Sequence, residues 1–295
     1  MAAQIFHHTR SKSFPLPSSS NPLVSHTEEH LVQLRDSDAP SSSSTISHKL
    51  NGLQELYDCV DKLLQLPFSR QALSQEQNKG LVDELLDGSL RLLDLCGTAK
   101  DIVLQTKGST QEIQSVLRRR RCGELELIGE LRKYFTSRKI VRKTVHKALK
   151  NLKAMETKRA FSSSDDHESK SMVSLLREVE AVTSSMFEYL LTIISGPKEQ
   201  SKSSRWLLVA KLLHQKRIVC EQAGRRDINE FVKVDAALKS LLSQKMSKSE
   251  NIMNVEMQSQ LKDLELCIED LEDGLECLFR CMIKARVSLL NIFNS

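Results

Sequence analysis

The stretch that decides the fold is Met257-Gln-Ser-Gln-Leu-Lys-Asp-Leu-Glu-Leu-Cys-Ile-Glu-Asp-Leu-Glu-Asp-Gly-Leu-Glu-Cys-Leu-Phe-Arg-Cys-Met-Ile-Lys-Ala-Arg-Val-Ser-Leu-Leu-Asn-Ile292. Its apolar residues recur alternately four and three apart, at Met257, Leu261, Leu264, Ile268, Leu271, Leu275, Leu278, Met282, Ala285, Leu289 and Ile292. This spacing puts them on one side of a helix about 54 Å long. The flanking positions hold small and aromatic residues as well as charges, which favours packing inside a multi-helix bundle over a two-stranded coiled coil.

The rest of the chain also favours helices. Of its 295 residues 44 are leucine and only 4% are aromatic, and four of the six prolines lie within residues 1–40. Periodic apolar positions predict helices over residues 46–66, 80–121, 124–160, 173–194, 203–221 and 227–242, where the second segment is one kinked helix or two. We therefore expect an elongated all-α bundle of about six or seven helices.

The N-terminal segment differs in composition from the bundle. Residues 1–44 contain no acid before Glu28 and are rich in serine and proline, which predicts a disordered tail with at most a short helix over residues 27–35. Residues 45–295 are expected to form one helical domain with a polar linker near residues 162–170. Seven scattered cysteines argue against a disulfide framework. The composition favours a cytoplasmic protein. The alternatives are a membrane-associated protein and a nuclear protein.

Several segments together resemble a known family. These segments are Phe6-His-His-Thr-Arg-Ser11, Leu86-Asp-Gly-Ser-Leu-Arg-Leu-Leu-Asp-Leu-Cys-Gly97, Arg118 to Arg121, Gly274-Leu-Glu-Cys-Leu-Phe-Arg280 and Arg286-Val-Ser-Leu-Leu-Asn291. In this combination the chain resembles the plant-specific BYPASS-like proteins. The resemblance implies an all-helical plant protein linked at family level to root and shoot development, with no catalytic residues to carry over. We therefore expect a non-enzymatic regulatory or interaction protein that docks protein partners.

Positive charge is concentrated in one segment. Residues 118–159 hold fifteen Lys and Arg against four acids, a net charge of +11, although the whole chain carries only +5. The candidate anion-binding residues are Arg118, Arg119, Arg120, Arg121, Lys139, Arg142, Lys143, Lys147, Lys150 and Lys153. One interpretation is a peripheral membrane adaptor that binds anionic lipid. The alternatives are a solvated face, or a basic helix neutralised by the acids of the final helix. Nucleic acid is disfavoured, because no recognition motif accompanies the charge.

The tail carries a candidate docking motif, Arg10-Ser-Lys-Ser-Phe-Pro15. Phosphorylation of Ser13 would create a dianion that is preceded by Arg10 and Ser11 and followed by Pro15. This is the type of ligand that 14-3-3 proteins bind. The alternatives are a passive linker and, less favoured because the prolines interrupt any amphipathic helix, an organellar import signal.

No pattern in the sequence indicates an enzyme, a cofactor or a metal. Cys277 and Cys281 stand four apart on an apolar helix without a histidine in the same segment, which is typical of packing. His146 and His214 each lie alone within predicted helices. We therefore expect neither catalytic residues nor a bound cofactor or metal.

Overall fold

The computed structural model describes residues 21–36, 43–119, 124–159, 170–196, 229–243 and 250–294. The described residues form eight α-helices and one 3₁₀ turn, and no strand. The elements are α1 (Pro22–Asp36), α2 (Ser43–Leu64), α3 (Pro67–Leu73), η1 (Glu76–Asn78), α4 (Lys79–Arg118), α5 (Glu124–Arg159), α6 (Lys170–Ser195), α8 (Glu230–Ser243) and α9 (Glu250–Phe293).

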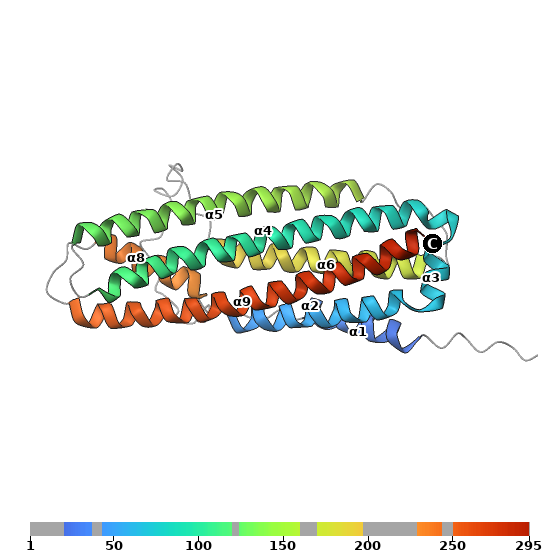
Figure 1. The fold of residues 1–295 in the computed structure, drawn as a ribbon, viewed down its shortest axis with the longest axis horizontal. Coiled ribbons are helices and arrows are strands. Elements are labelled where there is room, and N and C mark those ends of the chain that lie inside the picture. The colour runs from blue at the N-terminus through green and yellow to red at the C-terminus, as the bar shows by residue number, and fades with distance from the viewer. Residues whose placement is uncertain are drawn as a thin grey trace, which may run out of the picture.

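Four helices form the centre of an elongated bundle (Figure 1). The helices α2, α9, α4 and α6 each pack against the next, and α6 packs back against α2, which closes a ring. The long helix α4 runs antiparallel to α9, whereas α2 runs parallel to it. Around this ring, α5 lies on α4 and α6, α1 lies on α2 and α6, and α8 packs at one end against α9. The all-α fold predicted from the sequence is confirmed.

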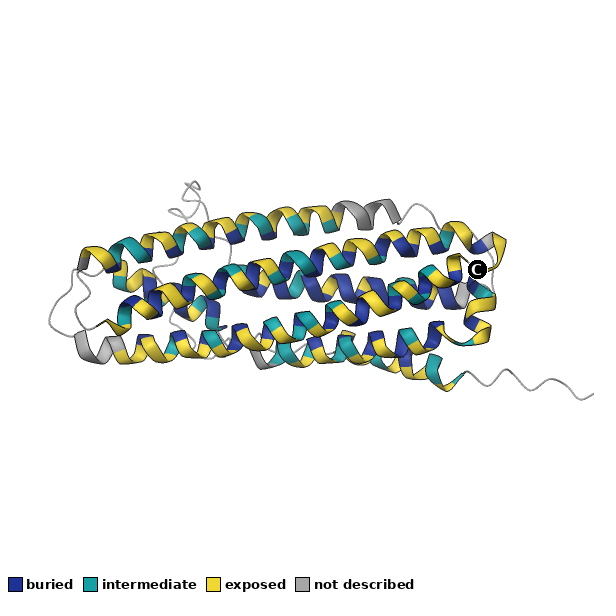
Figure 2. Cartoon of the chain, in the orientation of Figure 1, coloured by how far each residue is buried: buried dark blue, intermediate teal, exposed yellow. Residues whose placement is uncertain are grey.

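The heptad row of α9 is buried within the chain. Every residue of the row, from Met257 to Ile292, is at most 6% exposed, and the leucines from Leu261 to Leu278 are fully buried. Figure 2 shows these buried positions along the inner side of α9. Since α2 and α4 both contact this helix, the row closes against neighbouring helices of the same molecule.

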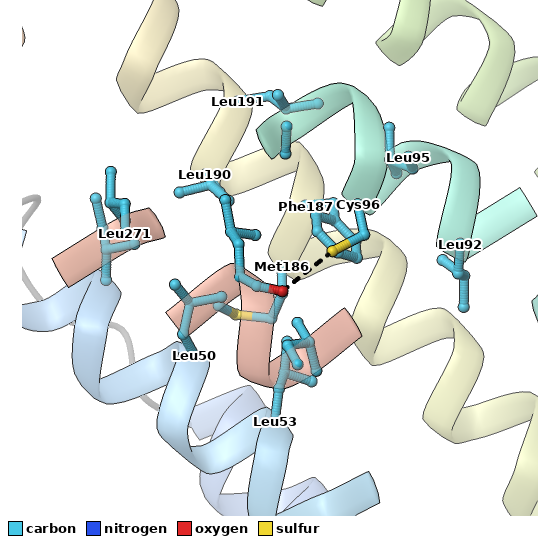
Figure 3. Close-up of a cluster of buried hydrophobic side chains, with 14 of the residues drawn as sticks. Leu50, Leu53, Leu92, Leu95, Cys96, Met186, Phe187, Leu190, Leu191 and Leu271 are labelled. Carbon is cyan, nitrogen blue, oxygen red and sulfur yellow. Dashed lines mark hydrogen bonds between the residues drawn. The ribbon is translucent and has the colours of Figure 1, made fainter. Parts of the chain in front are cut away.

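Side chains from all four central helices meet in the core (Figure 3). Leu50 of α2, Cys96 of α4, Phe187 of α6 and Leu271 of α9 lie in one cluster and are at most 2% exposed. The thiol of Cys96 donates to the carbonyl of Leu275 over 3.7 Å, and burial raises its pKa to about 12. This cysteine therefore acts as a small apolar core residue that remains protonated.

A glycine allows α2 and α9 to approach closely. An added Cβ at Gly274 would lie 3.0 Å from Cδ1 of Leu50 and 3.5 Å from its Cβ. The carbonyl of Gly274 also accepts a hydrogen bond from Nε2 of Gln54 at 3.1 Å. The small residue expected beside the heptad row is thus required by the neighbouring helix.

Two features differ from the expectation. Helix α4 is continuous over 40 residues, because packing on α9, α5 and α6 outweighs the weak propensity of its glycines. Helix α1 begins at Pro22, and it buries Leu31 and Leu34 against the bundle, so residues 22–36 belong to the packed structure. The helix expected over residues 203–221 and the linker near 162–169 lie outside the described residues. Among the described helices, none combines the length and apolar character that a membrane span requires.

Two glycine substitutions test this packing. Gly97→Ala is expected to stabilise the protein by about 0.8–1 kcal/mol, since the new methyl group meets no heavy atom within 4 Å and alanine favours the helix.

Gly274→Leu is expected to destabilise the protein by about 1–3 kcal/mol, because the side chain would overlap Leu50. Urea unfolding measures both changes. A Gly274→Leu variant as stable as the natural protein would contradict the close approach of α2 and α9.

Candidate functional site

The basic helix α5 has two faces with different roles. Its inner face packs on α4 and α6 through buried residues that include Leu131, Tyr134, Val141 and Val145. The opposite face carries exposed cationic side chains. The candidate site is therefore the outer surface of α5, and its geometry depends on how the inner face is held.

A buried polar cluster anchors the inner face of α5 to α8. The guanidinium of Arg138 is 1% exposed and donates from Nε to Oδ1 of Asp235 at 3.0 Å and from Nη2 to Oδ2 at 3.1 Å. Arg142 donates from Nη2 to the same Oδ2 at 2.9 Å, and the hydroxyl of Tyr134 donates to Oδ1 at 2.9 Å. Each oxygen of Asp235 therefore accepts at least two hydrogen bonds, which is the condition for keeping a carboxylate buried.

The same arginines satisfy the C-terminal end of α6. Arg138 donates to the carbonyl of Ile194 at 2.8 Å, and Arg142 donates from Nε to the carbonyl of Ser195 at 3.1 Å. Gly196 ends the helix with φ of 70°. Asn229 caps α8 by accepting from the amide of Val232 at 2.9 Å, and its Nδ2 donates to the carbonyl of Ile193 at 3.3 Å. Positive groups at a helix C-terminus are also favoured by the helix dipole.

Two further contacts complete the cluster. Burial and the charge of Asp235 raise the pKa of Tyr134 far above its ordinary value, so the phenol remains a hydrogen-bond donor. The guanidinium carbon of Arg138 lies 5.8 Å from the ring centroid of Phe231, a cation–π contact. Because Nη1 of Arg138 has no hydrogen-bond partner among the described residues, this contact helps to offset its desolvation.

The outer face of α5 presents a row of lysines. Lys139, Lys143, Lys147 and Lys150 are exposed, and none forms an ion pair with a described residue. Their spacing of four, four and three residues keeps them on one side of the helix over about 17 Å. We call this group the lysine row. A row of exposed ammonium groups attracts polyanionic surfaces.

The acids of α9 do not neutralise the lysine row. Glu272 pairs with Lys107 of α4 at 2.5 Å, and Glu276 pairs with Lys100 of the same helix. Glu265 accepts from Nε2 of Gln114 at 3.1 Å, again from α4. The alternative in which the final helix neutralises the basic helix is therefore contradicted for these three acids, because their partners lie on α4.

The remaining predicted anion-binding residues are distributed differently. Arg142 is part of the buried cluster, so its assignment to the anion-binding surface is corrected. Lys153 pairs with Glu188 at 3.0 Å and Arg119 with Glu126 at 3.0 Å, and Arg118 makes only a long contact of 3.4 Å with Gln114. Two predicted anion-binding residues, Arg120 and Arg121, lie outside the described residues. The tail motif with Arg10, Ser11, Ser13 and Pro15 also lies outside them.

Asp235 was not foreseen from the sequence. Its signal is weak but present, because it lies between Phe231 and Leu238 on the side of α8 that carries the apolar residues. An acid at such a position requires a buried cationic partner. Sequence alone does not reveal that the partner is Arg138, 97 residues earlier.

Two of the three cysteines of α9 belong to the packing. Cys267 and Cys281 are buried, whereas Cys277 is exposed. Burial is the largest cause that raises the pKa of Cys281 to about 11, and its thiol lies 3.7 Å from Oδ1 of Asp58. This thiol therefore remains protonated and Cys281 is a packing residue, whereas the packing interpretation of Cys277 is wrong because its side chain is exposed.

A small cavity of about 210 Å³ lies between α4, α5 and α6. Its lining includes Arg91, Asp94, Thr98, Asn151 and Ser184. Sites for small molecules usually measure about 300–1,000 Å³, so the volume favours a surface site over this cavity.

The fold and the lysine row define an elongated, all-helical bundle protein with one basic face. The family model described as Protein BPS1 matches residues 49–292, which is most of the chain. The chain therefore belongs to the BPS1 family of plant proteins, and the resemblance to BYPASS-like proteins is confirmed. No curated protein and no solved structure matches the chain.

The buried cluster makes a testable stability prediction. Replacing Asp235 by alanine leaves Arg138 buried without its counter-charge, so we expect a loss of about 3–5 kcal/mol in the free energy of unfolding, measured with urea. The matched control is Glu126→Ala, which removes the exposed partner of Arg119 and should cost less than about 1 kcal/mol. Equal effects of the two variants would show that Asp235 does not hold the arginines.

Proposed function

We propose that this protein is a non-enzymatic regulatory protein of plant root and shoot development that docks partners on its bundle surface. The family resemblance supports the developmental context. The observation that carries the docking proposal is the lysine row of α5, which is exposed and has no described carboxylate partner. Its occupant is the anionic leaflet of a membrane, which makes the protein a peripheral membrane adaptor.

Electrostatics supports a membrane as the occupant. Each lysine close to an anionic leaflet contributes about 1 kcal/mol, so four lysines supply about 4 kcal/mol, a thousandfold increase in binding. The row is also held in place, because Arg138 and Arg142 fix α5 from the inside. A straight row on a fixed helix loses little conformational entropy when it meets a flat charged surface.

Vesicle sedimentation tests the lysine row. The purified full-length protein is expected to bind vesicles that contain phosphatidylserine and not vesicles of phosphatidylcholine, and to be released as salt is raised. Replacing Lys143, Lys147 and Lys150 by glutamate should weaken binding by at least about 100-fold, since three attractions of about 1 kcal/mol each are lost.

The control for this experiment removes the same charge elsewhere. Lys239, Lys262 and Lys284 are exposed residues of α8 and α9, and their replacement by glutamate changes the net charge equally. This control variant should bind vesicles almost as well as the natural protein. A similar loss in both variants would mean that net charge and not the lysine row governs binding, and absence of binding at low salt would refute the membrane proposal.

The tail offers a second docking element, supported by the motif from Arg10 to Pro15. We expect the full-length protein phosphorylated on Ser13 to bind a purified 14-3-3 protein, because the phosphate dianion would meet a basic groove. Ser13→Ala should abolish binding measured by calorimetry, whereas Ser20→Ala should leave it unchanged. Binding that persists in the Ser13→Ala variant would exclude this site.

A further inference from the structure

A cluster of metal-binding side chains lies where α1 packs on α2. His26 and His30 are four residues apart on α1, and Cys59 faces them from α2. Each offers one ligand atom, and these atoms all lie within 4.8 Å of one another. Nδ1 of His26 is 3.3 Å from Sγ of Cys59, and the two imidazole rings meet edge to face with centroids 4.5 Å apart.

These distances are close to those of a tetrahedral zinc site. Zinc binds sulfur at about 2.3 Å and imidazole nitrogen at about 2.0–2.1 Å, which places a sulfur and a nitrogen ligand about 3.6 Å apart. The separation between His26 and Cys59 is already in this range, and the other separations, at most 4.8 Å, must shorten by no more than about 1.5 Å. Two imidazoles with one thiolate form a ligand set that zinc favours.

A carboxylate completes the surroundings. Glu55 lies four residues before Cys59 on α2, and its Oε2 is 3.9 Å from Nδ1 of His30. Two residues from each helix, spaced four apart, therefore face one another across the interface. A thiolate together with this carboxylate would balance the two positive charges of the metal, and carboxylates commonly orient the imidazoles that bind zinc.

The cluster is open enough to be loaded. His26 is exposed and the His30 side chain is 15% exposed, whereas Cys59 is 6% exposed. Leu31 and Leu34 supply the buried apolar contacts of α1, and Leu23 and Val24 also pack against the core. The metal can thus approach from the solvent side with a bound water in its fourth position.

We propose that His26, His30 and Cys59 form a binding site for one zinc ion, with Glu55 orienting His30. The ion links α1 to α2 across residues that are 33 apart in the chain, and it fixes the helix that follows the tail motif in the sequence. The site is independent of the lysine row, so it stands or falls apart from the docking proposal. Sequence patterns did not predict it, although the His-x3-His spacing on a helix was its available signal.

Cobalt provides the first test, because Co²⁺ takes the same ligands as zinc and its spectrum reports the geometry. The purified full-length protein is expected to bind one Co²⁺ with tetrahedral visible bands and a sulfur-to-metal charge-transfer band, both removed by Zn²⁺. Replacing both His26 and His30 by glutamine should weaken Zn²⁺ binding more than 100-fold and remove the charge-transfer band. Glu55→Gln should weaken it by about 10–100-fold, as expected for a residue that orients a ligand.

Two variants serve as matched controls. His146 and Cys277 are exposed on α5 and α9, and His146→Gln and Cys277→Ser should bind metal like the natural protein. The histidine variant keeps the buried Cys59 in place, so its fold can be verified by circular dichroism, and added zinc should raise Tm only when both histidines are present. A natural protein without the charge-transfer band, or a histidine variant that binds Zn²⁺ undiminished, would overturn the proposal.

Discussion

The structure depends on burying the apolar row of α9 inside a single chain. The helix is 44 residues long, and the leucines of its apolar row from Leu261 to Leu278 are fully shielded from water. Helix α4, with 40 residues, accompanies it along most of its length, whereas α2 has only 22. The 14-residue helix α8 packs on α9 near the end that α2 does not reach (Figure 1). The lengths and positions of α2, α4 and α8 therefore follow from the apolar surface of α9 that these helices must cover.

The separate helix α8 meets the end of α6 within the bundle, and that junction explains the buried charges. Helix α6 ends at Ser195 beside α8, so its last carbonyls and the start of α8 meet within the bundle. Arg138, Arg142 and Asn229 supply the donors that these carbonyls need, and Asp235 supplies the counter-charge. Such a cluster contributes little net stability compared with an apolar packing, but any misplacement of α8 would leave a charge buried without a partner. We regard this buried cluster as the feature that specifies how the end of α6 joins α8.

The sequence was informative where one helix face repeats a pattern and uninformative where distant residues meet. The row from Met257 to Ile292 predicted both the helix and its buried side. The continuity of α4 could not be predicted, because packing overrides glycine propensity. The basic segment predicted in the sequence contains the lysine row. That Arg142 of the same segment faces α8 and not solvent could not be predicted, because the sequence does not report which side of the helix meets α8. The pairing of His26 with Cys59 depends on how α1 returns along α2, which local spacing does not report.

The choice between arginine and lysine along α5 reflects the two environments. Arg138 occupies a buried position and Arg142 a half-buried one, where a planar guanidinium donates several hydrogen bonds at once and remains charged. Lys139, Lys143, Lys147 and Lys150 occupy the exposed positions, where a hydrated ammonium on a flexible stem contributes almost nothing to the fold. An exposed row of like charges is unfavourable for the isolated helix. The row therefore does not serve the stability of the helix, and the proposed docking to an anionic membrane accounts for its presence.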